Sequence, residues 1–277
     1  YPVLSPRKKR GVYASPASAT GMIAKDDLCY VDGTRFVIND TPVEMGLNDE
    51  PKQLISMGAY VIIMPDKKWI NTIDTTEFGN IEAEITTSSP VSFTLCRMDG
   101  TDYSETEIPR NEPSKPANMD LWIDTSTEPH SLKQWSKSSG MWVTIPTTYV
   151  KISSPGIGAA FEKYDGITIS GLKDTVLHDN VSGNAIEDTS DLAALDGSAV
   201  VWEKGNNYIV VVGILDITRT ISDSITISRK MPVMDFMVES DNRLWGCKYG
   251  MADNGQVVNE IYACKLGDFK NWNCFMG

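Results

Sequence analysis

Residues suited to acid–base or metal chemistry are few and scattered in this sequence. Only two histidines occur, His130 and His178, whereas a catalytic triad or a multi-histidine metal site brings several such groups together. Both lie in polar stretches, so we expect solvated surface histidines. The five cysteines contain no C-x-x-C pair, which supports neither a zinc site nor a disulfide framework. We expect reduced, partly buried thiols, although Cys247 and Cys264 could face each other across a hairpin.

Carboxylates are abundant but form no recognisable catalytic pattern. A glycosidase needs two of them across a cleft, with the pKa of one raised. Three adjacent pairs occur, all in turn-like segments: Asp26 and Asp27, Asp49 and Glu50, and Glu187 and Asp188. The run Asp99-Gly-Thr-Asp102, followed by Glu105, lacks the spacing of an EF-hand loop, and no nucleotide-binding glycine motif is present. The sequence therefore predicts no catalytic residue, no metal and no cofactor.

Tryptophan is the residue type that offers a binding chemistry. Of the seven tryptophans, Trp122, Trp135 and Trp142 fall in one polar stretch, and a flat indole can stack on a sugar ring while nearby Asp and Asn side chains bond its hydroxyls. Large aromatic side chains are also the usual core of small β modules. We favour this structural role and keep glycan stacking at these three residues as the alternative.

The charge distribution argues against nucleic-acid binding. The chain carries a net charge of −12, yet Arg7-Lys-Lys-Arg10 supplies four positive charges in the first twenty residues, where no acid occurs. The remainder therefore holds 21 basic against 37 acidic residues, or about −16. Such a surface repels phosphate and would suit a wall past which DNA slides. The longest apolar runs, 59–64 and 208–215, are too short to span a bilayer as helices.

The pattern of apolar residues predicts an all-β fold with a meandering framework. Short β-branched and aromatic runs alternate with turn residues. We expect an extended arm over residues 1–20, which contain three prolines, and a strand framework formed by 21–96 and 231–277. Asp32-Gly33 predicts a hairpin turn, and the apolar run at 59–64 predicts a strand covered on both faces.

Two further regions interrupt this framework. Residues 97–152 are rich in Pro, Ser and Thr, and predict a loop-rich module with three short strands, each carrying one of the three tryptophans named above. Residues 153–230 have their own strand set and predict a small inserted β-sandwich. Ile23–Tyr30 and Val238–Trp245 share one pattern of apolar residue, turn and outgoing strand, which is typical of propeller blades.

The last strands carry a resemblance to a known family. The motif residues are Asn242, Arg243, Leu244, Trp245, Gly267, Asp268 and Trp272. They resemble a recurring motif of structural proteins of gut Firmicutes phages and prophages, and more distantly the blade motif of podovirus tail tubular (nozzle) proteins. Those relatives are β-propellers with inserted domains that form rings around the DNA channel. Leu121–Ser126, with Pro129 and Trp142, is similar to a short β module of phage tail and fibre proteins.

The resemblance implies a non-enzymatic virion structural protein of the tail: a nozzle, hub or connector. Its partners would be copies of itself in a homo-oligomeric ring and other tail or connector proteins, with DNA passing through but not bound specifically. It would be made in the cytoplasm of the host bacterium. The blades present are too few to close a propeller, so we expect a fragment of a longer chain. The alternatives are a glycan- or receptor-binding tail protein and, less favoured, a tail-associated polysaccharide hydrolase.

Overall fold

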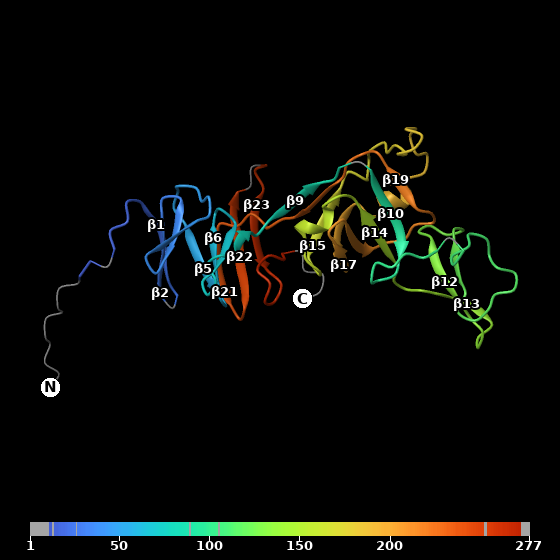
Figure 1. The fold of residues 1–277 in the computed structure, drawn as a ribbon, viewed down its shortest axis with the longest axis horizontal. Helices are drawn as coiled ribbons and strands as arrows, with labels where there is room; N and C mark the ends of the chain where they lie inside the picture. The colour runs from blue at the N-terminus through green and yellow to red at the C-terminus, as the bar shows by residue number, and fades with distance from the viewer. Residues whose placement is uncertain are drawn as a thin grey trace. The chain divides into compact units, whose positions relative to one another are not determined.

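The computed structural model describes residues 11–12, 14–25, 27–88, 90–104, 106–251 and 254–272. The predicted all-β class is confirmed, as Figure 1 shows: of the described residues, 45% are in strands and 3% are helical. The chain divides into two compact units, Tyr1–Ile81 with Met237–Leu244, and Glu82–Phe236 with Trp245–Gly277. Most of the predicted arm, residues 1–10 and 13, lies outside the described residues. No helix in the described ranges is long and apolar enough to cross a membrane.

The first unit contains two four-stranded antiparallel meanders. Their strands are β1 (Ala19–Lys25), β2 (Asp27–Asp32), β3 (Arg35–Ile38) and β4 (Thr41–Glu44), then β5 (Gln53–Met57), β6 (Tyr60–Met64), β7 (Lys68–Asn71) and β8 (Phe78–Asn80). The predicted hairpin is confirmed, since Asp32 pairs with Arg35 and Gly33 begins the turn with a φ of +63°. This left-handed conformation costs glycine little.

The core of the first unit lies between the two meanders. The first contributes Val31 and Phe36, and the second contributes Val61, Ile63 and Ile70, all fully buried. The prediction that the apolar run of β6 is covered on both faces is confirmed, because Val61, Ile62 and Ile63 are all 0% exposed. Complete burial of one such side chain contributes about 1.5–3 kcal/mol to folding.

The second unit is built on a β-sandwich. One sheet has the order β17-β18-β14-β10-β19 and the other β16-β15-β20-β9. Their bounds are β9 (Ala83–Thr86), β10 (Val91–Cys96), β14 (Tyr149–Ser153), β15 (Gly166–Ser170), β16 (Gly197–Val200), β17 (Glu203–Gly205), β18 (Tyr208–Val212), β19 (Arg219–Ile221) and β20 (Thr226–Arg229). Phe93 and Ile152 from the first sheet pack with Ile167 and Ile227 from the second in one buried core. Two short helices accompany the sheets, η1 (Ile157–Ala160) and α1 (Ser190–Ala193).

The sandwich takes more of the chain than the sequence predicted. Strands β9 and β10 were expected in the framework and β14 in the loop-rich module, but β10 pairs with both β14 and β19, and β9 pairs with β20. The first unit therefore ends at Ile81 rather than at residue 96. The physical reason is that strand pairing is long-range, so the local pattern that identifies a strand does not say which sheet it joins.

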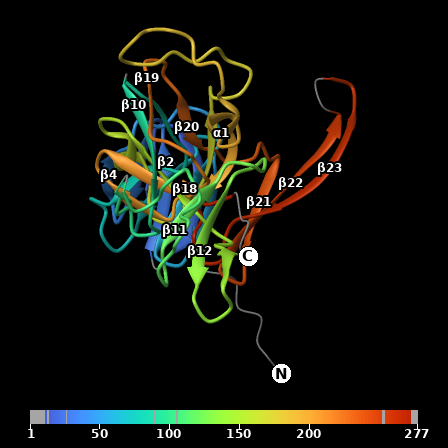
Figure 2. The same cartoon turned by 90° about the vertical axis from the view of Figure 1, so that its right-hand side faces the viewer.

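Two three-stranded sheets complete the fold. The predicted tryptophan strands are present as β11 (Leu121–Asp124), β12 (Ser131–Ser136) and β13 (Met141–Thr144); these strands and the preceding segment from residue 106 are called the tryptophan module below. The predicted closing meander is present as β21 (Phe236–Ser240), β22 (Arg243–Met251) and β23 (Val257–Ala263). Figure 2 shows β22 and β23 running side by side as a long hairpin.

Candidate functional site

The three tryptophans of the module share one face of its sheet. Trp122 pairs with Lys133 across β11 and β12, and Trp135 pairs with Trp142 across β12 and β13. Because side chains alternate along a strand and paired residues project to the same side, all three indoles lie together. The ring centroid of Trp142 is 5.4 Å from that of Trp122 and 5.3 Å from that of Trp135. Trp142 is thus the central member of an indole cluster.

The polar edges of this cluster are engaged by the module itself. Trp122 donates from Nε1 to the carbonyl oxygen of Arg110 over 3.2 Å, and Trp142 donates from Nε1 to Oε1 of Glu112 over 2.9 Å. The Lys133 ammonium lies 5.1 Å from the Trp122 ring centroid, within the range of a cation–π contact. All three indoles are half-buried. These contacts suit side chains that hold a small module together, as predicted, while part of each ring stays accessible.

A carboxylate–ammonium pair closes one end of the indole face. Lys133 donates from Nζ to Oδ2 of Asp124 over 2.5 Å, and both the backbone amide and the hydroxyl of Ser126 donate to Oδ1 of Asp124. The bond from Lys133, followed by those from Ser126, lowers the pKa of Asp124 to about 2. The carboxylate is therefore a fixed anion and is not suited to acid–base catalysis near neutral pH.

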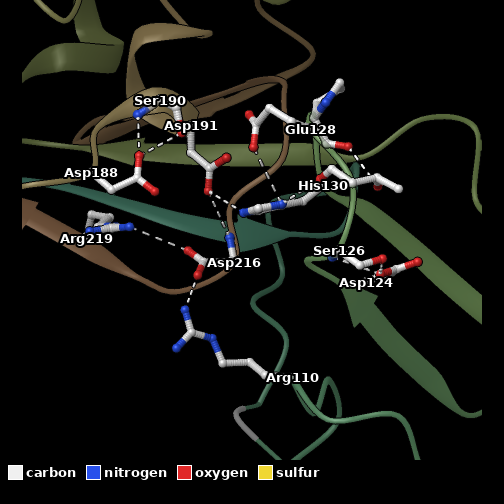
Figure 3. A network of polar contacts seen from close by, with 12 residues as sticks. Arg110, Asp124, Ser126, Glu128, His130, Asp188, Ser190, Asp191, Asp216 and Arg219 are labelled. Carbon is white, nitrogen blue, oxygen red and sulfur yellow. Dashed lines mark hydrogen bonds and ion pairs between the residues drawn. The ribbon is translucent and has the colours of Figure 1, made fainter.

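The tryptophan module is held to the sandwich by a polar network (Figure 3). His130 of the module places its Nε2 3.8 Å from Oδ2 of Asp191, which α1 of the sandwich carries. Arg110 of the module forms an ion pair with Asp216, whose Oδ1 also lies 3.6 Å from Nη2 of Arg219. Two separate contacts therefore link the loop-rich module to the sandwich.

Burial and neighbouring charge shift the protonation of this network. Burial alone would lower the pKa of His130, but the Thr127 carbonyl, 3.0 Å from Nδ1, and the charges of Asp191 and Glu128 raise it above its usual value. Burial also raises the pKa of Asp191, against the opposing effect of His130. A protonated His130 beside Asp191 is the arrangement that satisfies both groups.

The same atoms offer the ligand types of a metal site. One ligand atom each from His130, Asp191 and Asp216 lies within 4.8 Å of the others. However, Asp216 is already paired with two arginines, and those cations lie where a metal ion would need negative charge. The geometry is that of an ion-pair network. Arg110 and Asp216 of this network also line an open groove of about 420 Å³, whose other lining residues are Thr94, Leu95, Tyr103, Ser104, Ile108, Pro109, Leu215, Ile217 and Thr218.

The motif residues of the closing meander have structural surroundings. Asn242 adopts a left-handed turn conformation with a φ of +59°, and Leu244 is fully buried. Gly267, with a φ of +75°, and Asp268, which accepts the amide of Lys270 over 3.1 Å, form the later turn. Trp272 is 9% exposed and donates from Nε1 to the carbonyl of Phe269 over 2.9 Å.

The remaining motif residues begin β22. Arg243 is partly buried at the first position of the strand, whereas Trp245 keeps 40% of its surface exposed. Trp245 is therefore only partly buried.

One prediction about the histidines needs correction. His130, expected on the solvated surface, has a side chain only 14% exposed, because Asp191 of α1 lies against it. His178, with the same expectation, is 42% exposed and lies 3.1 Å from Asp223. The prediction of thiols outside disulfides is confirmed for Cys247 and Cys264, and Cys247 pairs with Ile261 rather than with Cys264.

The sequence also gave no signal for three members of the network, Arg110, Asp191 and Asp216. They lie in different segments and match no short motif. Of the predicted carboxylate pairs, Asp188 binds the amide and hydroxyl of Ser190 at the start of α1, which is the turn role expected for it. Asp26 and Glu105 lie outside the described residues.

Comparison with known proteins returned no relative: no protein-family model, no curated protein and no solved structure matches this chain.

Proposed function

We propose that this chain is a non-enzymatic structural component of a bacteriophage tail, acting as a nozzle, hub or connector. The observation that carries the proposal is the repeated meander of the first unit. Strands β1–β4 and β5–β8 form two four-stranded antiparallel sheets that share one core, which is how successive propeller blades pack. Tail nozzle proteins, which the closing motif resembles, are built from such blades.

The path of the chain supports a framework that carries an insertion. The first unit is left at Ile81 and re-entered at Met237. The returning segment is bonded to β5 at Met237. Gln53 at the start of β5 donates from Nε2 to the Met237 carbonyl over 2.6 Å, and the Met237 amide donates to Oε1 of Gln53 over 3.3 Å. The returning strand is therefore fastened to the same meander from which the chain departed.

The clusters of charged side chains among the described residues hold the tryptophan module and the sandwich together. His130 and Arg110 join the tryptophan module to the sandwich, and the Asp165–Arg229 pair is buried inside the sandwich. Each of these groups has a partner of opposite charge within the chain. We infer that the protein works through assembly with copies of itself and with other tail or connector proteins. The acidic surface would let DNA pass without specific binding.

The proposal is tested by the composition of purified phage particles from a strain that carries this gene. Mass spectrometry of intact tails should detect the chain at a stable ratio to other tail proteins, and disruption of the gene should abolish complete tails. Normal tail assembly without the protein would contradict the proposal. Loss of host attachment alone, with complete tails, would favour a receptor-binding role instead.

A glycan-binding tail protein is the second candidate. It is favoured by one observation, the convergence of three half-buried indoles on a single face of the module. Two of the three indole nitrogens already bond to the module's own segment, so we rank this function below assembly. Binding of any saccharide on a broad panel, lost in Trp135→Ala with the fold retained, would reverse the ranking.

A further inference from the structure

The hairpin of β22 and β23, called the ribbon below, has two chemically different faces. Its register pairs Trp245 with Ala263, Cys247 with Ile261, Tyr249 with Asn259 and Met251 with Val257. Since paired residues project to one side and alternate along each strand, these eight residues form one face. None of the eight is acidic or basic.

The opposite face is the polar one, and it is engaged within the chain. It carries Gly246, Lys248 and Gly250 from β22 against Tyr262, Glu260 and Val258 from β23. Lys248 donates from Nζ to Oδ1 of Asp235 over 2.9 Å, and Asp235 also accepts the amide of Tyr249. In most sheets the apolar face is covered and the polar face is exposed. In the ribbon, by contrast, Lys248 on the polar face has a partner within the chain.

The apolar face is strongly exposed. Tyr249 is 66% exposed, Met251 74%, Val257 83% and Ile261 76%, while Trp245 at the base of the ribbon is 40% exposed. Aromatic side chains have roughly 150–250 Å² to bury and aliphatic ones less, so these fractions leave up to roughly 600 Å² of mainly apolar surface uncovered. The largest apolar patch on a typical monomer measures about 300–600 Å² and often marks an interaction site.

We propose that a second copy of this chain covers the apolar face, with two ribbons packed face to face about a two-fold axis. Two such patches would bury about 1,200 Å² in total, which reaches the lower range of stable protein–protein interfaces. The charge of the chain limits where a second copy can approach. Copies with a net charge of −12 repel each other over most of their surface, but the uncharged apolar face allows close approach.

The outer edge of the ribbon carries no feature that would keep a second ribbon away from the adjoining apolar face. β23 is the terminal strand of its sheet, and its sequence, Val257 to Ala263, contains neither proline nor lysine. Seven consecutive pairs join β22 and β23 without a register shift, so the ribbon has no bulge to turn its edge away. Strands that must not associate are commonly blocked by these devices.

This inference rests on the proposed function in that it names one contact between copies in the assembly.

The test is sedimentation equilibrium of the full chain over a concentration series, for the wild type and for Val257→Glu/Ile261→Glu. The matched control is Val181→Glu, because Val181 is a 92% exposed valine in the segment between β15 and α1, outside the ribbon. Hydrogen exchange of 257–263 should slow as the wild-type concentration rises.

We expect a wild-type dimer, an unchanged dimer for Val181→Glu, and a dimer dissociation constant raised by about tenfold or more in the double variant. Thermal unfolding checks that the double variant folds, and Met251→Lys serves in its place if it does not. A monomeric wild type would overturn the inference, as would a dimer that survives both ribbon variants or protects a different surface. A monomer that is still found in assembled tails would leave the proposed function standing and remove only this interface.

Discussion

Nε2 of His130 lies 3.8 Å from Oδ2 of Asp191, and this contact joins the tryptophan module to the β-sandwich (Figure 3). The two residues come from distant segments, a loop between β11 and β12 and the short helix α1. His130 is 14% exposed and Asp191 6%, so the pair is sensitive to the protonation of either member.

Protonation of His130 should make the attachment of the module depend on pH. The pKa of His130 is raised in the folded protein because the Thr127 carbonyl and the charges of Asp191 and Glu128 outweigh the effect of burial. A histidine whose pKa is higher in the folded than in the unfolded protein stabilises the folded state fully when the pH is below its unfolded pKa, about 6.5. This stabilisation is lost as the pH rises through the pKa of the folded state. Urea unfolding of wild type and His130→Gln should therefore differ most in mildly acidic solution and converge above neutral pH. Parallel pH profiles for the two proteins would contradict this role.

Removal of one member of the buried Asp165–Arg229 pair should be strongly destabilising. Their side chains are 4% and 6% exposed, and burial already raises the pKa of Asp165. Arg229→Met leaves this carboxylate without its ion-pair partner, which typically costs about 3–5 kcal/mol. The double variant Asp165→Leu/Arg229→Met should recover part of the loss, since it removes both buried charges. Chemical denaturation measures both values, and a loss below about 1 kcal/mol for Arg229→Met would show that the pair contributes little.

Gly158 should tolerate no side chain. A Cβ at this position would lie 1.8 Å from the carbonyl oxygen of Gly205 and 2.5 Å from that of Tyr208, so the backbone of η1 or of the β17–β18 turn would have to move. Gly158→Ala should destabilise the sandwich by more than the roughly 1–3 kcal/mol typical of overpacking. Gly11→Ala is the matched control, because nothing lies within 4 Å of its Cβ position. Equal melting temperatures for the two variants would show that the close approach is absent in solution.

Trp142 should matter more to the module than either of its neighbours. It contacts both other indoles and bonds to Glu112, so Trp142→Ala removes the centre of the cluster. We expect Trp142→Ala to lower the free energy of unfolding by about 1–3 kcal/mol. This is less than for fully buried aromatic residues, because the ring is half-buried. Trp135→Ala should cost less. Hydrogen exchange over 121–144 reports on the module directly, and equal protection in all three proteins would argue that the cluster has no structural role.

The sequence predicted local structure well where one segment carried its own signal. Asp32-Gly33 specified a hairpin because a left-handed turn favours glycine, and the run 59–64 specified a doubly covered strand because it lacks polar alternation. The three tryptophan strands were likewise identified from short aromatic runs between turn residues. In each case the deciding interactions lie within a few residues.

Features that depend on distant partners could not be predicted in this way. Strand β10 was assigned to the framework, although its partners are β14 and β19. The burial of His130 depends on α1, which lies far along the chain and carries no motif. The exposed apolar face of the ribbon was missed for a related reason. Alternation predicts that one face is apolar, but only the structure shows that Tyr249, Met251, Val257 and Ile261 on that face are exposed.

We propose that the chain is a structural component of a phage tail, and its position in the particle decides whether this proposal holds. Cryo-electron microscopy of tails carrying a label fused to this protein should place the label on the tail axis, in several symmetry-related copies around the DNA path. A label confined to peripheral fibres, or absent from complete tails, would contradict the account.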